Sequence, residues 1–505
     1  MTRHTMRLEP SPSPTLADRF EQLRIDLGIE VQFPADALAE AEAAAARVAA
    51  ELAAPPGDVL DARDVALVTI DPPGSMDLDQ AVHIERDGSG FRVRYAIADV
   101  AQAVTPGGAL DRVTRERGTT VYGPATRLPL HPPVLSEGVL SLLPDVDRFA
   151  YLWDVRLDER GEQVDAQVRR AVVRSRARLS YAGAQAAIDD GSATDVLLLL
   201  REVGVLRLDR ERDRGGVSLD VPEQQAVVDG AGVHLEFREV LPVEAWNAQI
   251  SLLTGMAAAR MMVAAGVGIL RTLPPADPRD LERLRRAAVA LGIEWPASLA
   301  YADLLDRLDA RTPAHAAFMN EATSLFRGAD YRVLDAEAGH PLPADPADAQ
   351  HAAIAARYAH VTAPLRRLVD RYGLEVCAAV SAGEPVPAWV REGLAGLPEI
   401  MSSTGQRAAA FERGCVDAVE AAVLRGREGE VFDGVVVDTN GSRGRGTVMI
   451  AEPAVRAKVS SPGADLELGS RVRVRLAHAE VGDGKVGFEL AEEPAAAGGG
   501  VTRAR

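Results

Sequence analysis

The chain has 505 residues, a formal net charge of −18 at pH 7, and apolar and charged fractions close to globular averages. That length excludes one ordinary domain and predicts two or three, and the composition excludes a largely disordered or collagen-like chain. The two cysteines, Cys377 and Cys415, exclude a disulfide framework or a zinc cluster, and we expect both to be buried apolar residues. The acidic net charge taken alone disfavours binding to nucleic acid. Whether the protein has a nucleic-acid-binding surface therefore depends on where its arginine and lysine residues lie.

The sequence has no apolar run of roughly 18 residues, and its first residues, MTRHTMRLEPSPSPT, lack the apolar core of a signal peptide. We therefore expect a cytoplasmic protein with no membrane partner. The sequence implies no stable protein partner, and we expect a monomer, although nothing in the sequence fixes the oligomeric state.

In chain order, residues 1–14 are rich in proline and serine and are predicted to be disordered. Helical periodicity with a long alanine run then predicts a helical N-terminal element over residues 15–58. A mixed α/β domain follows over residues 59–400. It begins with the strand patterns VALVTI, AVHI and FRVRYAIADV and continues with helices predicted at Ala245–Ala265, Pro278–Leu291, Leu304–Leu308 and Pro364–Val380.

The last third of the chain predicts a helix and then a small barrel. A connecting helix is expected over residues 401–427, and residues 428–493 contain five short apolar strands separated by glycine-rich turns. Short strands at this spacing are typical of an OB-fold-like β-barrel. Residues 494–505 are of low complexity and are predicted to be disordered. The predicted fold class is α+β.

A group of carboxylates follows the first predicted strand, in the segment TIDPPGSMDLDQA. Asp77 and Asp79 are two residues apart, which turns both to one face of an extended segment, and Asp71 across the turn can complete a site of three carboxylates. Oxygen ligands of this kind favour Mg²⁺, with Mn²⁺ as a substitute. In isolation, however, aspartates at this spacing are more often turn residues.

A second candidate segment contains two adjacent arginines. Thr362-Ala363-Pro364 predicts the start of a helix with Arg366 and Arg367 in its first turn, where the helix dipole favours a nearby anion such as phosphate. Asp370 lies four residues after Arg366 and can hold that guanidinium. The alternative is an ordinary ion pair on a solvated helix face.

Longer stretches of the chain resemble one family. VTIDPPGSMDLDQAVHIERDGSGFRVRYAIADVAQAV is similar to the opening of the catalytic RNB domain of the ribonuclease II and ribonuclease R family. RGTTVYGPATRLPLHPPVLSEGVLSLLPDVDRFA, VVRSRARLSY, GHPLP and YAHVTAPLRRLVDRY resemble further family segments in the same order, over roughly residues 60–380. The resemblance implies a 3′-to-5′ exoribonuclease that threads single-stranded RNA into a channel and releases nucleoside monophosphates by a two-metal mechanism.

The resemblance also implies roles for particular residues. Asp71, Asp77 and Asp79 match the family's catalytic, metal-binding aspartates, and Arg366 matches an arginine that stabilises the transition state. Gln80 stands where the family has a fourth aspartate. Its amide carbonyl can still offer an oxygen to a metal, but the lost charge weakens one metal site.

Further residues are candidates for RNA binding. By resemblance, Tyr122 stacks on a base and Glu412 lines the channel; the alternatives are a core tyrosine and a surface glutamate. Arginines recur at alternate positions of two predicted strands and also lie in one loop. They could follow a phosphate backbone or simply form solvated faces. They are Arg174, Arg176 and Arg178 on the first strand, Arg471, Arg473 and Arg475 on the second, and Arg443 and Arg445 in the loop. Arg367 is a candidate through its place beside Arg366.

Three functions remain open at this point. The first is the exoribonuclease, and the second is a catalytically weak RNA-binding or regulatory protein that keeps the channel, favoured by Gln80 and the acidic charge. The third is a metal phosphodiesterase for DNA or small nucleotides. Only about 60 residues precede the catalytic segment, so we expect the family's cold-shock-like domains to be missing and the substrates to be shorter or less structured. The sequence leaves the RNA substrate and the role of the N-terminal helices open.

Overall fold

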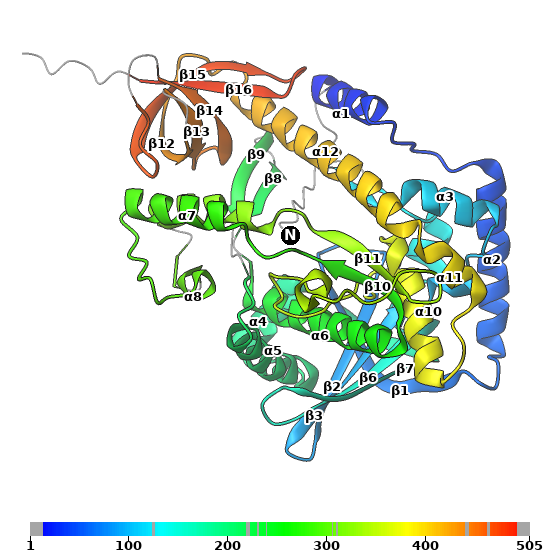
Figure 1. Ribbon diagram of the computed structural model, residues 1–505. Coiled ribbons are helices and arrows are strands. Elements are labelled where there is room, and N and C mark those ends of the chain that lie inside the picture. Colours follow the sequence, from blue (N-terminus) through cyan, green and yellow to red (C-terminus); the bar gives the residue numbers. More distant parts are fainter. Residues whose placement is uncertain are drawn as a thin grey trace, which may run out of the picture.

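The structure is a computed structural model that describes residues 14–123, 127–218, 223–229, 232–238, 240–305, 307–309, 312–439, 444–461 and 465–491. The predictions for residues 1–13, for Arg443 and for residues 494–505 lie outside these ranges. Within them, two closed five-stranded barrels are separated by a body of helices (Figure 1). This mixed architecture confirms the predicted fold class.

The first barrel is formed by β1 (Leu60–Asp71), β2 (Gln80–Asp87), β3 (Gly90–Ala98), β6 (Asp147–Leu157) and β7 (Gln163–Ser180), in the order β1-β2-β3-β6-β7. The neighbouring strands are antiparallel except where β7 closes the barrel against β1 in parallel. In this parallel pair Asp71 lies opposite Ser180. The carboxyl ends of β1 and β7 therefore lie on the same rim of the barrel. The loop of residues 72–79, called the aspartate loop below, begins there and contains Asp77 and Asp79.

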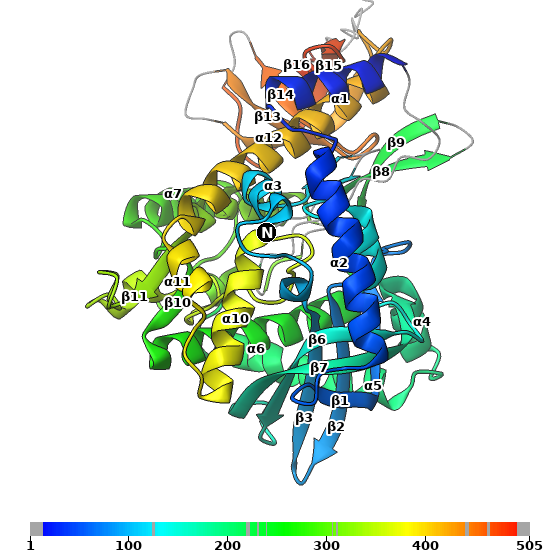
Figure 2. The same ribbon diagram turned by 90° about the vertical axis from the view of Figure 1, so that its right-hand side faces the viewer.

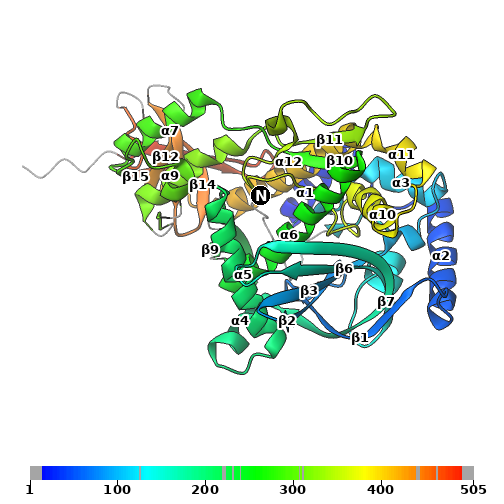
Figure 3. The same ribbon diagram turned by 60° about the horizontal axis from the view of Figure 1, so that its bottom comes forward.

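The first barrel contributes residues to two hydrophobic cores. Phe91, Val93, Tyr95 and Ile97 of β3 alternate, as predicted, into a core shared with the helices α5 (Asp195–Asp213), α6 (Pro242–Ala265) and α10 (Leu368–Ala382). On the other face of β3, Ala96 and Ala98 belong to a second core, whereas Arg92 and Arg94 are partly exposed. Figure 3 shows α6 lying beside the curved strands. Both cysteines are buried, as predicted.

Of the described helices, α6 is long and apolar enough to cross a membrane by length and composition alone, a feature that the sequence analysis did not anticipate. Its buried residues include Val243, Trp246, Ile250 and Leu253, all in the main core. A helix enclosed by protein on most sides has the same composition as a membrane span. Burial in the core therefore accounts for its apolar character.

Smaller elements surround this body. They are α4 (Tyr181–Asp189), the hairpin β4 (Val121–Tyr122) and β5 (Arg127–Leu128), the pair β8 (Glu223–Asp229) and β9 (Gly232–Arg238), the pair β10 (Val267–Thr272) and β11 (Asp330–Asp335), α7 (Pro278–Ala290), α8 (Tyr301–Leu305), α9 (Pro313–Ala322), α11 (Ala388–Leu394), the π-helical turn η2 (Val134–Val139) and the 3₁₀ turns Val100–Gln102, Thr323–Phe326 and Pro346–Ala349. The helices α7, α8 and α9 enclose a separate small core.

The N-terminal element consists of α1 (Pro14–Asp26) and α2 (Ala35–Ala53). Helix α2 runs along one side of the first barrel (Figure 2) and buries Ala37, Ala41, Ala44 and Val48. It contacts α3 (Ala109–Arg117) and η2. The alanine run thus supplies a flat helix face that can approach its neighbours closely.

The second barrel confirms the predicted small β-barrel. Its strands are β12 (Val431–Asp438), β13 (Arg445–Ile450), β14 (Val455–Ser460), β15 (Arg471–Glu480) and β16 (Lys485–Leu490), in the order β12-β13-β14-β16-β15. The connecting helix α12 (Leu397–Leu424) begins four residues before the predicted range of 401–427 and ends three residues before the end of that range. It packs against α1, β15 and β16 and ties this barrel to the N-terminal element.

Candidate active site

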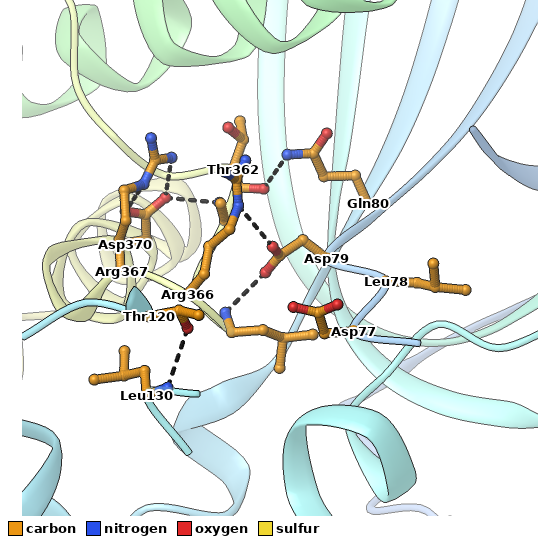
Figure 4. A network of polar contacts seen from close by, with 12 residues as sticks. Asp77, Leu78, Asp79, Gln80, Thr120, Leu130, Thr362, Arg366, Arg367 and Asp370 are labelled. Atoms are coloured by element: carbon orange, nitrogen blue, oxygen red, sulfur yellow. Dashed lines mark hydrogen bonds and ion pairs between the residues drawn. The ribbon is translucent and has the colours of Figure 1, made fainter. Parts of the chain in front are cut away.

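The aspartate loop joins β1 to β2 and is fixed by hydrogen bonds at its centre. The Ser141 hydroxyl donates to the Met76 carbonyl oxygen at 2.6 Å and accepts from the Leu78 backbone N–H at 3.0 Å. Leu78 is fully buried in the second core of the first barrel. Because neighbouring residues in an extended segment point in opposite directions, a buried Leu78 turns Asp77 and Asp79 together to the other side (Figure 4).

Asp79 is the most enclosed carboxylate of the loop, with 5% of its surface exposed. Its Oδ1 accepts the backbone N–H of Leu365 at 2.8 Å, and its Oδ2 accepts the Nε–H of Arg366 at 3.2 Å. Burial, and next the charge of Asp77, raise the pKa of Asp79 well above its usual value. Asp79 and Arg366, which are 287 residues apart in sequence, form one ion pair.

Asp77 is paired with an arginine that the sequence analysis did not select. One guanidinium nitrogen of Arg127 contacts Asp77, and the other contacts Glu137. The Asp77 side chain is 15% exposed. Burial raises the pKa of Asp77, and the charge of Arg127 opposes that shift without cancelling it.

Gln80 has a different set of contacts from the predicted one. Its Oε1 accepts the hydroxyl of the buried Tyr95 at 2.5 Å, and its Nε2 donates to the Thr362 carbonyl oxygen. The oxygen that was expected to face a metal is therefore turned to Tyr95. In this arrangement Gln80 connects β2 and β3 to the segment that contains Arg366.

Asp71 ends β1 and is half-buried. Its Oδ2 is buried, and its charge, like that of Asp79, raises the pKa of Tyr95 after the larger effects of burial and of Tyr181. Across the described ranges, no three His, Cys, Asp or Glu side chains are grouped closely enough to hold one metal ion. The donor chemistry of the three aspartates nevertheless suits a hard divalent cation. In this structure Arg127 and Arg366 are the positive charges paired with Asp77 and Asp79.

The arginine segment corrects one prediction. The helix expected from Pro364 begins only at Leu368, because residues 364–366 form a turn instead. Asp370 accepts the Ala363 backbone N–H at 2.7 Å, and the Arg366 carbonyl accepts the Thr120 N–H at 3.0 Å. These contacts hold the chain away from a helical path.

Asp370 binds Arg367 and not Arg366, which also departs from the prediction. The Arg367 Nε and Nη2 donate to the two Asp370 oxygens at 2.8 and 2.7 Å, and Asp370 is fully buried. This bidentate pair leaves the Arg366 guanidinium directed at Asp79 (Figure 4). The two neighbouring arginines therefore have different partners.

The predicted RNA-binding residues are spread over the molecule. Tyr122 on β4 is 41% exposed. The arginines Arg174, Arg176 and Arg178 alternate on β7 as predicted. Arg174 pairs with Asp147 at 2.6 Å and Arg176 donates to the Arg63 carbonyl at 2.5 Å. Arg178 reaches the aspartate loop, where it donates to the Ser75 carbonyl at 3.3 Å.

The remaining candidates lie on α12 and on the second barrel. Glu412 is half-buried on α12. Arg471, Arg473 and Arg475 are exposed on one side of β15, alternating with the less exposed Val472 and Val474 as expected. Arg445 is also exposed. These residues belong to elements distinct from the aspartate loop, and their binding to RNA stays a prediction.

Three residues near the loop were missed by the sequence analysis: Arg127, Glu137 and His131. The segment that contains them, RLPLHPPVLSE, resembles a family segment, but that resemblance implied no role for these three residues. The available signal was an opposite pair of charges, Arg127 and Glu137, in an otherwise apolar stretch. Charges of that kind near a buried site are expected to be paired.

His131 is buried, and its Nδ1 lies 3.1 Å from the Leu365 carbonyl, which can only accept, so Nδ1–H donates. Burial lowers the pKa of His131 to about 4 from the ordinary 6.5. Between these values the unfolded chain takes up a proton that the folded chain does not. The contribution of His131 to the free energy of unfolding is therefore fully present above pH 6.5. It is lost as the pH falls from 6.5 towards 4, and the loss is on the order of 3 kcal/mol.

Urea unfolding at a series of pH values from 4 to 7 checks this expectation, with His131→Asn as the matched variant because an amide donates to the same carbonyl without titrating. We expect a flatter acid limb for the variant. Identical pH profiles for the two proteins would contradict the assignment to His131.

The fold and this site define the class of protein. The RNB domain matches residues 59–378, and the RNase II-type exonuclease C-terminal S1 domain matches residues 430–491. The chain belongs to the RNB-domain family, whose members include the 3′-to-5′ exoribonucleases of the ribonuclease R type.

Individual relatives agree with this placement. Ribonuclease R of Escherichia coli is 26% identical over 478 residues, which are 85% of this chain and 57% of that protein. The chain therefore spans little more than half the length of this relative. The structure of Mycoplasma genitalium RNase R in complex with ribose-methylated single-stranded RNA superposes with a TM-score of 0.82 at 16% identity, over 95% of this chain and 78% of that one. Yeast Ssd1, described as a pseudonuclease, superposes with a TM-score of 0.63 at 16% identity, over 86% and 53%.

Proposed function

We propose that the protein is a metal-dependent 3′-to-5′ exoribonuclease that hydrolyses single-stranded RNA to nucleoside monophosphates by a two-metal mechanism. The observation that carries the proposal is the contact of Asp79, a buried carboxylate beside Asp77, with the Arg366 guanidinium at 3.2 Å. Carboxylates that bind a cation and an arginine that meets phosphate charge are the parts that phosphodiester hydrolysis needs. Membership of the RNB-domain family supports the same reaction.

Asp71, Asp77 and Asp79 are the residues that would hold the divalent ions, Mg²⁺ or alternatively Mn²⁺. Such ions lower the pKa of an attacking water and stabilise the leaving oxygen. Arg366 then turns from Asp79 to the scissile phosphate, where its planar fork can meet two oxygens as negative charge develops. The carbonyl of Arg366 stays fixed by Thr119 and Thr120, so only its side chain has to move.

The charge balance of the site gives a physical reason for metal dependence. Asp77, Asp79 and Glu137 contact two guanidinium groups, those of Arg127 and Arg366. Asp71 at the end of β1 adds a fourth negative charge, and Arg178 at the loop adds a third positive one. With every group ionised the site is negative and repels an RNA phosphate. Divalent cations reverse that sign, so RNA placement at the site and metal binding are expected to be linked.

The second candidate is a catalytically weak RNA-binding or regulatory protein. The occupied amide of Gln80 favours it, because the position of the family's fourth aspartate supplies neither a charge nor a free oxygen. The fold similarity to a pseudonuclease is consistent with it. We also propose that the protein works as a monomer in the cytoplasm.

The deciding experiment incubates purified protein with a 5′-labelled single-stranded RNA in Mg²⁺ or in EDTA and resolves the products on a gel. The exoribonuclease predicts a Mg²⁺-dependent ladder that shortens from the 3′ end, and matched DNA should remain intact. RNA that is bound but uncut under every metal tested would favour the second candidate.

Replacement of Gln80 tests the part of the proposal that concerns the metal site. Gln80→Glu keeps the acceptor for Tyr95 but removes the N–H that binds the Thr362 carbonyl, and it adds a charge. We expect a loss of about 1–3 kcal/mol in unfolding free energy in EDTA, and a smaller loss in Mg²⁺. Gln80→Leu is the control, because it loses the hydrogen bonds to both Thr362 and Tyr95 without gaining affinity for metal. Equal losses for Gln80→Glu in EDTA and Mg²⁺ would place the residue outside the metal site.

A further inference from the structure

The hairpin of β4 and β5 has two different faces. Val121 lies opposite Leu128, and Tyr122 lies opposite Arg127. Val121 and Leu128 are 7% and 3% exposed and line a cavity of about 520 Å³ together with residues of the segment between α1 and α2. Because neighbouring strand residues point to opposite faces, Tyr122 and Arg127 share the other face. That face leads from the exposed Tyr122 to the aspartate loop.

The Arg127 guanidinium divides its donors between two carboxylates. One terminal nitrogen contacts Asp77 and the other contacts Glu137, while the side chain remains 26% exposed. Glu137 belongs to the π-helical turn η2, which is anchored by α2 and by the bond from Arg148 to the Gly138 carbonyl at 3.1 Å. Glu137 is thus part of a rigid turn, whereas Asp77 belongs to the loop that would take up a cation.

Arg127 and Arg366 are each paired with one aspartate of the loop. Asp77 and Asp79 lie on the same side of the loop, and each is paired with an arginine from a different element, Arg127 from β5 and Arg366 from the turn before α10. Guanidinium groups recognise phosphate and carboxylate oxygens with the same planar geometry. A group held by a carboxylate in one state can therefore bind a phosphate in another.

We propose that Arg127 is an RNA phosphate-binding residue. In the absence of a divalent cation Asp77 binds its guanidinium group, and when Asp77 binds a cation instead, Glu137 keeps Arg127 at the site. This proposal rests on the proposed function, since it requires Asp77 to bind a divalent ion. Tyr122 and Arg127 then act as one unit. The tyrosine ring stacks on a base while the guanidinium binds a backbone phosphate near that base. The binding is independent of base sequence, because neither contact reads a base edge.

The dependence of RNA affinity on salt concentration tests the proposal, since each neutralised phosphate of a single strand contributes about 0.7 to the slope of log K against log salt. The affinity of full-length protein for a 5′-fluorescein single-stranded RNA is measured by anisotropy at several NaCl concentrations, in Ca²⁺ and in EDTA. A gel confirms that the RNA stays intact. The proteins compared are the unaltered chain, Arg127→Gln, Arg127→Lys and Arg112→Gln.

In Ca²⁺ we expect Arg127→Gln to lower the slope by about 0.7 and Arg127→Lys to keep it, because lysine retains the charge. In EDTA the unaltered protein and Arg127→Gln should have the same slope, because Asp77 and Glu137 already neutralise Arg127. Arg112→Gln removes an equal charge from the 60% exposed Arg112 on α3 and should leave the slope unchanged in both conditions. A residue with a purely structural role would alter the melting temperature and not the slope.

Equal slopes for Arg127→Gln and the unaltered protein in Ca²⁺ would overturn the proposal, as would a reduction that is just as large in EDTA. These outcomes are separate from a failure of the proposed function. That failure would be recognised in the unaltered protein alone, as RNA that is never shortened in Mg²⁺, while the difference in slope would still report on Arg127.

Discussion

Asp79→Asn is expected to lower the rate of Mg²⁺-dependent RNA shortening by on the order of 10²–10³-fold. Asp79 is the one loop carboxylate that contacts both Arg366 and the backbone N–H of Leu365. An amide keeps an acceptor for Leu365 but loses the charge that binds a cation. Single-turnover assays at saturating Mg²⁺ measure the effect. Activity within about threefold of the unaltered protein would contradict a metal-binding role for Asp79.

The same variant should not lose stability. The pKa of Asp79 is raised in the folded state, mainly by burial. A raised carboxyl pKa means that the folded chain holds its proton more tightly, so the stability from this group is full at low pH and is lost as the pH rises through the folded pKa. Without a cation the charged form of Asp79 is therefore unfavourable in the folded chain, and asparagine removes that cost. We expect an equal or higher melting temperature in EDTA, and a smaller rise than the unaltered protein shows on addition of Mg²⁺.

Substitutions of the two neighbouring arginines are expected to have different effects. Arg366→Lys keeps a positive charge beside Asp79 but loses the planar fork that can meet two phosphate oxygens. We expect kcat to fall by on the order of 10²-fold with little change in unfolding free energy. Steady-state kinetics and urea unfolding on the same preparation check both statements. Retention of full activity by the lysine variant would remove Arg366 from the catalytic site.

Arg367→Ala should instead destabilise the fold. It leaves the fully buried Asp370 without its bidentate partner, and breaking a buried ion pair in this way costs about 3–5 kcal/mol. The double variant Arg367→Met with Asp370→Leu is the control, because it removes both charges and should recover much of that loss. An Arg367→Ala protein with unchanged stability and weaker RNA binding would contradict this structural role and support the predicted RNA-binding role of Arg367.

Predictions based on local periodicity agreed best with the structure. The alternation of Phe91, Val93, Tyr95 and Ile97 predicted a strand with one face in the core, and that face lies in the main core. The five short strands of the second barrel were predicted because each is a short apolar stretch separated from the next by a glycine-rich turn. The proximity of Asp77 and Asp79 followed from the same alternation along an extended segment. These features depend on neighbouring residues, which a sequence displays directly.

Contacts between segments that are distant in sequence determined the arrangement of the site residues. Leu365 and Arg366 meet Asp79 across more than 280 residues, as the sequence separations of their hydrogen bonds show, and the turn that this requires delays the helix to Leu368. Gln80 is turned to Tyr95 because β2 and β3 place them side by side.

By itself the sequence determined the strands β1, β2 and β3, the strands of the second barrel, the helices α6 and α7, the carboxylates of the loop and the resemblance to one family, since periodicity and short motifs depend on neighbouring residues. Only the tertiary structure decided which cation faces which carboxylate. Arg127 with Asp77, Arg366 with Asp79 and Arg367 with Asp370 are pairings of buried charges, and each depends on where the fold removes water and on which partner is within reach.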